Sequence, residues 1–327
     1  PEPYNNLGNI LKNLKKFDDA INNYKKAITL NPNYVECLNN LGIVYFEQGQ
    51  LENAFRYYKK ALALNPNFED TYSNLGIVYF HKNDADNAIK SYKKAISLNP
   101  NFVEAYDNLG TCLKTIGELK EALDNYQTAI SINPNLDLLL GNALNTMMNL
   151  CLWDEVNDQI EEVKNKIDLG KLVIDPFEFM ALTDNPRLLR KITEVYAKKN
   201  YPRSDILPKI DLYPIHKKIH IGYFSADFRL HPVSTLTAQL YEMHDRNKFE
   251  IHAFSLGRDS NDEMNQRIRN GVDYYHDVAD SSDKDIALLS RSLEIDIAID
   301  LGGFTEGART NVFAMSAAPI QIIYIGY

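Results

Sequence analysis

The first 134 residues repeat with a period of 34, and this period restricts the possible folds more than any other feature of the chain. Leu-Gly pairs and Asn-Pro-Asn triplets recur at this spacing. The pairs begin at 7, 41, 75 and 109, and the triplets begin at 31, 65, 99 and 133. A fixed period of this length predicts an array of identical helix pairs, in which each pair buries its apolar face only by stacking on its neighbours.

The small and aromatic residues within each copy identify the kind of repeat. Alanines occupy 20, 54, 88 and 122 and again 27, 61, 95 and 129, with tyrosines between them at 24, 58, 92 and 126. This pattern is typical of tetratricopeptide repeats. The glycines and alanines allow close approach of helices, and the proline of each triplet ends the second helix. We therefore predict four tetratricopeptide repeats in residues 1–134, forming an α-solenoid with a concave groove.

An asparagine precedes each Leu-Gly pair on the helix that lines the predicted groove. The four positions are Asn6, Asn40, Asn74 and Asn108. Asparagine is a mediocre helix former, so its recurrence needs a reason. One reading is an amide ladder that hydrogen-bonds the main chain of an extended peptide. The other is that asparagine satisfies local backbone groups at this repeat position.

Residues 135–216 lose the period. Segments 135–150 and 153–167 resemble one degenerate helix pair, as expected of a unit that caps a solenoid. The proline-rich remainder contains a good helix from Pro186 to Lys198. We interpret 135–216 as a capping helix pair and a helical linker.

Apolar runs and helical patterns alternate in residues 217–327. Strands are predicted at 218–224, 249–256, 272–278, 295–301 and 319–325, and helices at 233–244, 261–271, 283–294 and 309–317. This alternation predicts an α/β Rossmann-like domain, a doubly wound parallel sheet with helices on both faces. In such sheets ligands bind at the carboxyl ends of the strands.

Three loops follow predicted strands. The first contains Ser225, Asp227, Arg229 and His231; its imidazole is either a general base or orienting group, or a structural hydrogen-bond partner. The second runs from Gly302 to Arg309. Its glycines allow close backbone approach, and Thr305 and Arg309 supply polar contacts; the alternative is a tight turn held by an Arg–Glu pair. The third is Gly326-Tyr327.

Composition and absent motifs exclude several classes of function. The net charge of −9 and the lack of basic clusters disfavour nucleic acid as a partner. No apolar run reaches the roughly 20 residues of a membrane span. The three dispersed cysteines argue against a disulfide framework and a cysteine metal site. GxGxxG, HExxH, GxSxG and Walker motifs are missing, so NAD-dependent, protease, esterase and NTPase functions lack support.

Three motifs in order carry a family resemblance. They are Ile-Gly-Tyr-Phe-Ser-Ala-Asp-Phe-Arg-Leu-His-Pro-Val-Ser from Ile221, Asp-Leu-Gly-Gly-Phe-Thr-Glu-Gly-Ala-Arg from Asp300, and Ala-Pro-Ile-Gln-Ile-Ile-Tyr-Ile-Gly-Tyr from Ala318. Joined to tetratricopeptide repeats, they resemble the O-linked N-acetylglucosamine transferases and their SPINDLY-type relatives. The resemblance implies a GT-B glycosyltransferase, of which residues 217–327 are the N-terminal Rossmann-like lobe.

The resemblance also implies an activity: inverting transfer of N-acetylglucosamine from UDP-GlcNAc to Ser or Thr hydroxyls of proteins held by the repeats, with no metal and no cofactor. His231 matches the family's His-Pro histidine, a base or a positioning group. The asparagines at 6, 40, 74 and 108 match its peptide-binding ladder, and the loop with Gly303, Thr305 and Arg309 faces its cleft. A second histidine of vertebrate members aligns with Arg291, so no role as a base transfers there.

Family members continue past Tyr327 with a second lobe that contacts uridine and the diphosphate. We therefore expect the natural chain to extend at both ends, and residues 1–327 alone to be inactive. Partners implied are acceptor proteins or extended peptides and a nucleotide sugar, with no nucleic acid and no membrane, in the cytoplasm (or also the nucleus of a eukaryote). Two alternatives stay open: a peptide-binding adaptor with a structural lobe, and a SPINDLY-like O-fucosyltransferase that uses GDP-fucose.

Overall fold

The computed structural model describes residues 1–210, 213–305 and 307–324. The chain divides into two compact units, residues 1–193, here called the repeat unit, and residues 194–327, called the sheet unit. Among the described helices, none combines the length and apolar composition needed to cross a membrane.

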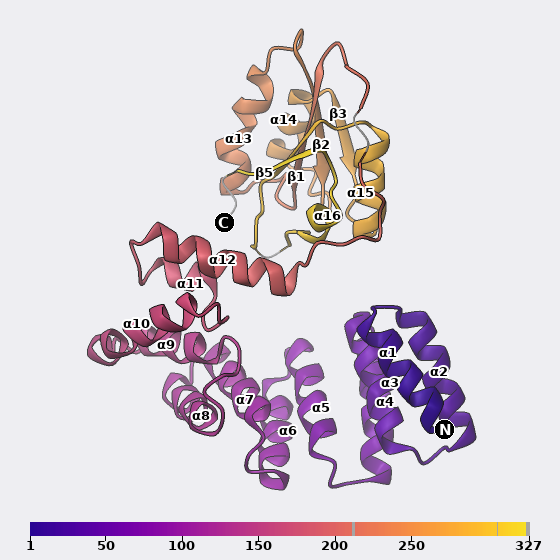
Figure 1. Cartoon of the computed structure of the whole chain (residues 1–327), viewed down its shortest axis with the longest axis vertical. Coiled ribbons are helices and arrows are strands. Elements are labelled where there is room, and N and C mark those ends of the chain that lie inside the picture. The colour runs from indigo at the N-terminus through magenta and orange to yellow at the C-terminus, as the bar shows by residue number, and fades with distance from the viewer. Residues whose placement is uncertain (211–212, 306, 325–327) are drawn as a thin grey trace. The chain divides into compact units, whose positions relative to one another are not determined.

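Antiparallel helix pairs make up most of the repeat unit (Figure 1). The four predicted repeats are α1 (Glu2–Asn13) with α2 (Phe17–Leu30), α3 (Val35–Glu47) with α4 (Leu51–Leu64), α5 (Glu69–His81) with α6 (Ala85–Leu98), and α7 (Val103–Thr115) with α8 (Leu119–Ile132). They are followed by α9 (Leu139–Asn149), α10 (Trp153–Asp168), α11 (Pro176–Met180) and α12 (Pro186–Asn200), the last of which crosses the boundary between the units.

Each repeat is closed by a glycine of its first helix packed on a tyrosine of its second. A Cβ added to Gly42 would lie 2.4 Å from Cε1 of Tyr58, and the other three pairs have the same geometry. These tyrosines are among the largest fully buried side chains of the chain. The tyrosine ring fills the space that a side chain at the glycine position would need. The glycine of the Leu-Gly pair and the tyrosine therefore recur together because they pack on each other.

The fifth helix pair, α9 with α10, keeps the array but changes its packing. A Cβ added to Gly141 of α9 would lie 2.7 Å from the Cα of Ile174. In the four repeats a tyrosine ring occupies the corresponding place. The segment at 172–174 also hydrogen-bonds α9, since the amides of Leu138 and Gly141 donate to the carbonyls of Leu172 and Val173 at 2.9 and 2.8 Å. An extended segment thus covers the last helix pair, which explains the loss of the period.

The described residues of the sheet unit form five parallel strands in the order β3-β2-β1-β4-β5. The strands are β1 (Ile219–Ser225), β2 (Phe249–Ser255), β3 (Tyr274–Asp277), β4 (Ile297–Asp300) and β5 (Ile320–Ile323). The helices are α13 (Pro232–Met243), α14 (Glu263–Gly271), α15 (Asp283–Ser292) and α16 (Asn311–Ala314). The predicted doubly wound parallel sheet is confirmed.

Alternating residues of β1 divide the core of this unit into two layers. Ile221 and Tyr223 pack with α13 and α14, whereas Phe224 packs with α15 and α16. Figure 1 shows α13 and α15 on opposite sides of the sheet. A strand buried on both faces reads as a run of apolar and aromatic residues, which is why Ile221–Phe224 is conspicuous in the sequence.

One predicted helix is much shorter than expected. A helix was predicted at 309–317, and α16 spans only Asn311–Ala314. The residues on either side of α16 are not helical. The guanidinium of Arg309 bonds Asp283 before the helix, and Ser316 after it has a φ of +60°. A residue in the left-handed region ends a helix, so the apolar pattern overestimated its length.

Candidate functional site

A pocket of about 620 Å³ lies at the carboxyl edge of the sheet unit. Three strand-end loops line it: the β1 loop with Asp227, Arg229 and His231, the β2 loop with Gly257 and Arg258, and the β4 loop with Thr305 and Gly307. The loops meet because parallel strands present their carboxyl ends at one edge, where ligands of open α/β sheets bind. The structure thus brings together His231 and Thr305, which the sequence placed 74 residues apart.

The β1 loop is held rigidly by its neighbours. Asn265 Nδ2 donates to the carbonyl of Phe228 at 2.6 Å, and the Leu230 amide donates to Oδ2 of Asp262 at 2.9 Å. The backbone amide of Asn265, which donates to Oδ1 of Asp262 at 2.8 Å, and next the amide of Leu230 hold the pKa of the Asp262 carboxyl below its usual range. Both partners come from the start of α14, so this helix positions the β1 loop.

His231 is the N-cap of α13. Its Nδ1 accepts a hydrogen bond from the amide of Val233 at 3.3 Å, and Oδ2 of Asp227 lies 3.6 Å from the same nitrogen. A neutral imidazole that accepts at Nδ1 carries its proton on Nε2. In this state Nε2 is a hydrogen-bond donor for a ligand in the pocket.

Of the three candidate residues of the β4 loop, only Thr305 lines the pocket, whereas Gly303 and Arg309 do not. Thr305 is exposed, lines the pocket and donates from Oγ1 to the Gly302 carbonyl at 2.7 Å. Gly303 is buried outside the lining residues, with a φ of +58° that favours glycine. Arg309 also lies outside the lining and bonds Oδ1 of Asp283 through Nε at 2.6 Å. The loop is thus held by an arginine–carboxylate pair, Arg309 with Asp283. Glu306 and the third candidate loop, Gly326-Tyr327, lie outside the described residues.

Asp300 ends β4 beneath this loop. Its Oδ1 accepts from the amides of Gly302 and Gly303 at 2.9 and 3.1 Å. Burial raises the pKa of this carboxyl, and the two backbone amides oppose that shift. The carboxyl therefore organises the glycine turn from below the pocket.

Arg291 has a structural role. Its guanidinium donates to the carbonyls of Pro208, Met315 and Ser316 at 2.7, 2.6 and 2.9 Å. All three bonds tie the end of α15 to neighbouring loops. The position that the resemblance aligned with a histidine is thus occupied by a side chain already engaged with the backbone.

In the repeat unit, two of the four asparagines of the predicted ladder, Asn40 and Asn74, bond the preceding repeat. Nδ2 of Asn40 donates to Oδ1 of Asn5 at 3.2 Å, and Nδ2 of Asn74 donates to Oδ1 of Asn39 at 3.1 Å. Asn142 makes the same bond to Asp107 at 3.0 Å, 34 residues after Asn108. Each of these amides donates one N–H to a side-chain oxygen of the preceding repeat, a contact that neither reading of the sequence described.

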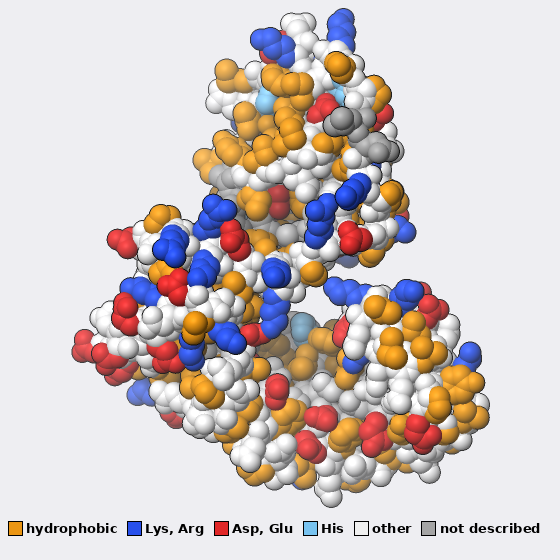
Figure 2. Space-filling view, viewed as in Figure 1, with side chains coloured by type: hydrophobic (Ala, Val, Ile, Leu, Met, Phe, Trp, Pro, Cys, Tyr) orange, Lys and Arg blue, Asp and Glu red, His pale blue; other side chains and the backbone are white. Residues whose placement is uncertain are grey.

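A groove of about 770 Å³ runs along the ladder. Its lining includes Asn40, Asn74 and Asn108, whereas Asn6 is exposed at the first repeat and outside the lining. The acids Asp70, Glu104 and Asp107 line the same groove, and burial raises the pKa of Asp70 and of Asp107. Figure 2 shows acidic side chains spread over the visible face of the repeat unit.

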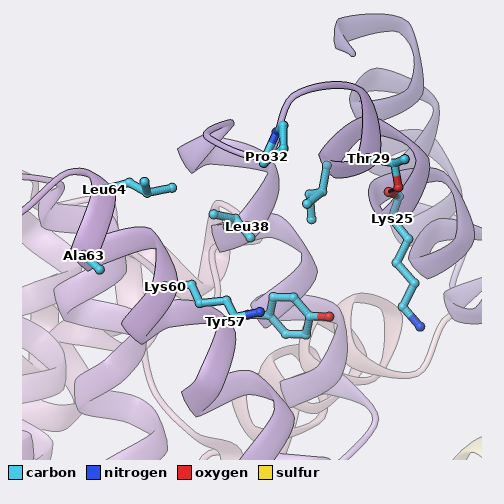
Figure 3. Close-up of a pocket in the computed structure, with 9 residues that line it drawn as sticks. Lys25, Thr29, Pro32, Leu38, Tyr57, Lys60, Ala63 and Leu64 are labelled. Carbon is cyan, nitrogen blue, oxygen red and sulfur yellow. Dashed lines mark hydrogen bonds between the residues drawn. The ribbon is translucent and has the colours of Figure 1, made fainter.

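A further pocket lies on the second helices of the repeats (Figure 3). It measures about 620 Å³ and is lined mainly by α2 and α4, with Pro32 of the connecting loop and Leu38 of α3. Lys25, Tyr57 and Lys60 stand beside aliphatic groups. Its lining, all within the described residues, contains no carboxylate, imidazole or thiol. It shares no lining residue with the ladder groove.

Two parts of these sites escaped the sequence analysis. Gly257 and Arg258 follow the buried second strand, and that position alone could have marked them. A Cβ on Gly257 would lie 2.1 Å from the Ala226 carbonyl oxygen, so the close approach of two loops requires glycine there. Asn142 could have been found by stepping 34 residues beyond Asn108.

Profiles of known families match most of the chain. Residues 188–327 match glycosyl transferase family 41. Residues 8–49 and 42–83 match a TPR repeat profile, and residues 69–102 and 91–124 match two tetratricopeptide repeat profiles.

Curated relatives agree with these profiles. The chain is 32% identical over 202 residues to the probable UDP-N-acetylglucosamine–peptide N-acetylglucosaminyltransferase SEC of Arabidopsis thaliana, an alignment that covers 56% of this chain and 20% of that protein. It is 31% identical over 115 residues to the probable UDP-N-acetylglucosamine–peptide N-acetylglucosaminyltransferase SPINDLY of Arabidopsis thaliana. That alignment covers 34% of this chain and 12% of that protein. The matched part thus spans a fifth or less of these relatives' length.

A solved structure of a mutant Thermobaculum terrenum O-GlcNAc transferase is 21% identical, with a TM-score of 0.48, and the match covers 90% of this chain and 50% of that one. The profiles thus match tetratricopeptide repeats followed by a glycosyl transferase family 41 segment, and the curated relatives that the chain resembles are named as probable N-acetylglucosaminyltransferases SEC and SPINDLY.

Proposed function

We propose that this chain provides the acceptor-binding repeats and the first lobe of a protein O-glycosyltransferase. The reaction is inverting transfer of N-acetylglucosamine from UDP-GlcNAc to Ser or Thr hydroxyls. The observation that carries the proposal is the pocket at the carboxyl edge, which combines His231, two arginines and Thr305 within the segment that matches family 41.

His231 supports this reaction as a positioning group. The acceptor hydroxyl attacks the anomeric carbon, the bond from that carbon to the diphosphate breaks, and the hydroxyl proton leaves with the departing UDP. Nε2–H of His231 can donate to a sugar or acceptor oxygen, because Nδ1 is engaged with Val233. Orientation of the two reactants is the main contribution that such a group makes to the rate.

Arg229 and Arg258 supply the positive charge of the pocket. Arg229 bonds Oδ1 of Asp227 through Nη2 at 3.0 Å, which fixes its orientation, and Arg258 is exposed at the β2 loop. Guanidinium groups stabilise charge that develops on a departing diphosphate. No metal is needed for this step in the proposal.

The groove of the repeat unit is proposed to hold the acceptor. An extended peptide presents main-chain N–H groups at regular intervals, and the side-chain oxygens of the ladder asparagines can accept them. This contact is independent of the peptide's side chains, so one groove could serve many acceptor proteins. The acids at Asp70 and Glu104 favour acceptors with lysine or arginine nearby.

The test uses the full-length product of the gene, incubated with UDP-GlcNAc and an acceptor protein pool, with product masses measured. The expected result is a mass gain of one N-acetylhexosamine, lost in the His231→Ala variant. Peptide capture by the repeats of that variant should equal that of the wild type.

Two results would contradict the proposal. A mass gain only with GDP-fucose would assign the SPINDLY-like activity. No gain with either donor, with peptides still captured, would assign an adaptor. Residues 1–327 are assayed alongside and are expected to capture peptides without transferring sugar.

A further inference from the structure

A second polar cluster lies at the amino ends of β1 and β2, the edge of the sheet away from the pocket. His220 and Glu250 are direct partners in the parallel register of the two strands. His252 follows Glu250 by two residues and therefore projects from the same face. The sheet thus places three potential metal ligands side by side.

The distances within this cluster suit a metal ion. Nε2 of His252 lies 3.1 Å and Nε2 of His220 lies 3.7 Å from Oε1 of Glu250. All three ligand atoms lie within 4.8 Å of one another. Ligands about 2.0–2.2 Å from a tetrahedral zinc ion are separated by roughly 3.3–3.6 Å, so only small side-chain shifts are needed.

We propose that His220, Glu250 and His252 form a binding site for a divalent transition-metal ion of the zinc type. Two imidazoles and one carboxylate are the donor set that such ions prefer, with a fourth position left for water. The site lies at the opposite edge from the transfer pocket and is independent of the proposed glycosyl transfer. Its expected role is to tie β1 to β2.

Both imidazoles have the outer contacts that orient a metal-bound histidine. Nδ1 of His220 lies 3.2 Å from the carbonyl oxygen of Leu293, and Nδ1 of His252 lies 3.0 Å from Nε2 of His276. A histidine that donates from one nitrogen to such a partner presents the lone pair of the other to the metal. His252 is only 3% exposed and stacks on the His276 ring at a centroid distance of 5.3 Å.

A neighbouring set, with His216 and Asp296 beside His220, is less suitable. Both nitrogens of His216 are engaged by carboxylates, Nε2 with Glu294 at 2.7 Å and Nδ1 with Asp296 at 3.3 Å. Oδ2 of Asp296 also accepts the amide of His220 at 2.9 Å. Each histidine of the proposed site turns only one nitrogen toward the carboxylate of Glu250. His216 instead has both nitrogens bound to carboxylates, so His216 and Glu294 serve as matched controls.

Solvent can reach the proposed site. The side chains of His220 and Glu250 are 19% and 26% exposed. An ion can therefore enter without unfolding the sheet, and Glu250→Gln changes a partly exposed side chain to one of almost the same shape.

The experiment is a competitive titration of Zn²⁺ against a chromophoric chelator at neutral pH, with residues 1–327 under a non-thiol reductant. Visible absorption with Co²⁺ then reports ligand geometry. We expect one equivalent to bind, with affinity at least tenfold lower in Glu250→Gln and in His220→Gln. His216→Gln and Glu294→Gln should change it less than threefold. Cys151→Ser should have no effect, which excludes the exposed thiol.

Far-UV circular dichroism of every variant shows whether the fold is kept. Saturating Zn²⁺ should raise the melting temperature of the wild type and leave that of folded Glu250→Gln unchanged. The proposal is overturned if the wild type binds no stoichiometric Zn²⁺. It is also overturned if folded Glu250→Gln and His220→Gln bind as tightly as the wild type, or if His216→Gln weakens binding equally.

Discussion

The imidazole of His231 caps the helix that begins with its own neighbour: Nδ1 accepts the amide of Val233 at 3.3 Å. The same side chain lines the pocket at the carboxyl edge of the sheet. One ring nitrogen therefore has a structural task and the other is available for a ligand. A structural hydrogen bond and a role as an orienting group are therefore compatible in this histidine, whereas a general base would need an unprotonated Nε2.

Replacing His231 by asparagine should separate these two tasks. Asparagine is a preferred N-cap residue, so the free energy of unfolding should stay within about 0.5 kcal/mol of the wild type. Sugar transfer by the full-length protein should fall at least tenfold, because asparagine does not reproduce the position of Nε2. His231→Ala should show the same loss of transfer and in addition lose about 1 kcal/mol of stability. Urea denaturation and a transfer assay on each variant check this, and full activity of His231→Asn would contradict it.

Gly42→Ala should destabilise the repeat unit by about 1–3 kcal/mol, because the new methyl group would overlap the buried ring of Tyr58. In an unpacked helix the same change stabilises by about 0.5–1 kcal/mol, so the sign of the effect tests the contact. Ala63→Gly, at an exposed position of α4, gives the size of the helix-propensity effect in this protein. The measurement is thermal unfolding followed by circular dichroism, and an increase in melting temperature for Gly42→Ala would disprove the packing argument.

The ladder bond between Asn39 and Asn74 should appear as a coupling energy of about 0.5–1.5 kcal/mol in a double-mutant cycle. Asn39→Ala should cost more than Asn74→Ala, since Oδ1 of Asn39 also accepts from Thr71 at 3.0 Å. Asn74→Ala combined with Asn142→Ala is the control, because these two share no bond and their effects should add. Equal coupling in both cycles, measured by urea denaturation, would show that the ladder does not transmit stability between repeats.

Asp300→Asn should increase the free energy of unfolding at pH 7. Burial raises the pKa of Asp300 above its ordinary value of 3.8, so the folded state holds the proton more tightly than the unfolded state. The resulting stability is fully present below pH 3.8 and is lost as pH rises through the folded-state pKa. Asparagine cannot ionise, yet its Oδ1 can still accept the amides of Gly302 and Gly303. Urea denaturation of both proteins at pH 7 and pH 4 should show the advantage of Asp300→Asn shrinking at the lower pH; a variant less stable at pH 7 would refute this.

Most of the fold could be predicted from local spacing. The 34-residue period requires no knowledge of distant contacts, since each repeat packs on its sequence neighbours. The alternation of apolar runs and helical patterns in 217–327 likewise predicted five parallel strands. The length of α16 was the exception, because the bond from Arg309 to Asp283 crosses between elements 26 residues apart.

The sites depend on contacts that local spacing does not encode. The order β3-β2-β1-β4-β5 brings the loops after β1, β2 and β4 to one pocket, and so joins Arg258 to His231 and Thr305. The same order, with the β1–β2 register, places His220 beside Glu250 at the other edge. A strand's own sequence shows which residues share its face, but it does not show which strand lies beside it. The chemistry at both edges of the sheet is therefore decided when the strands pair.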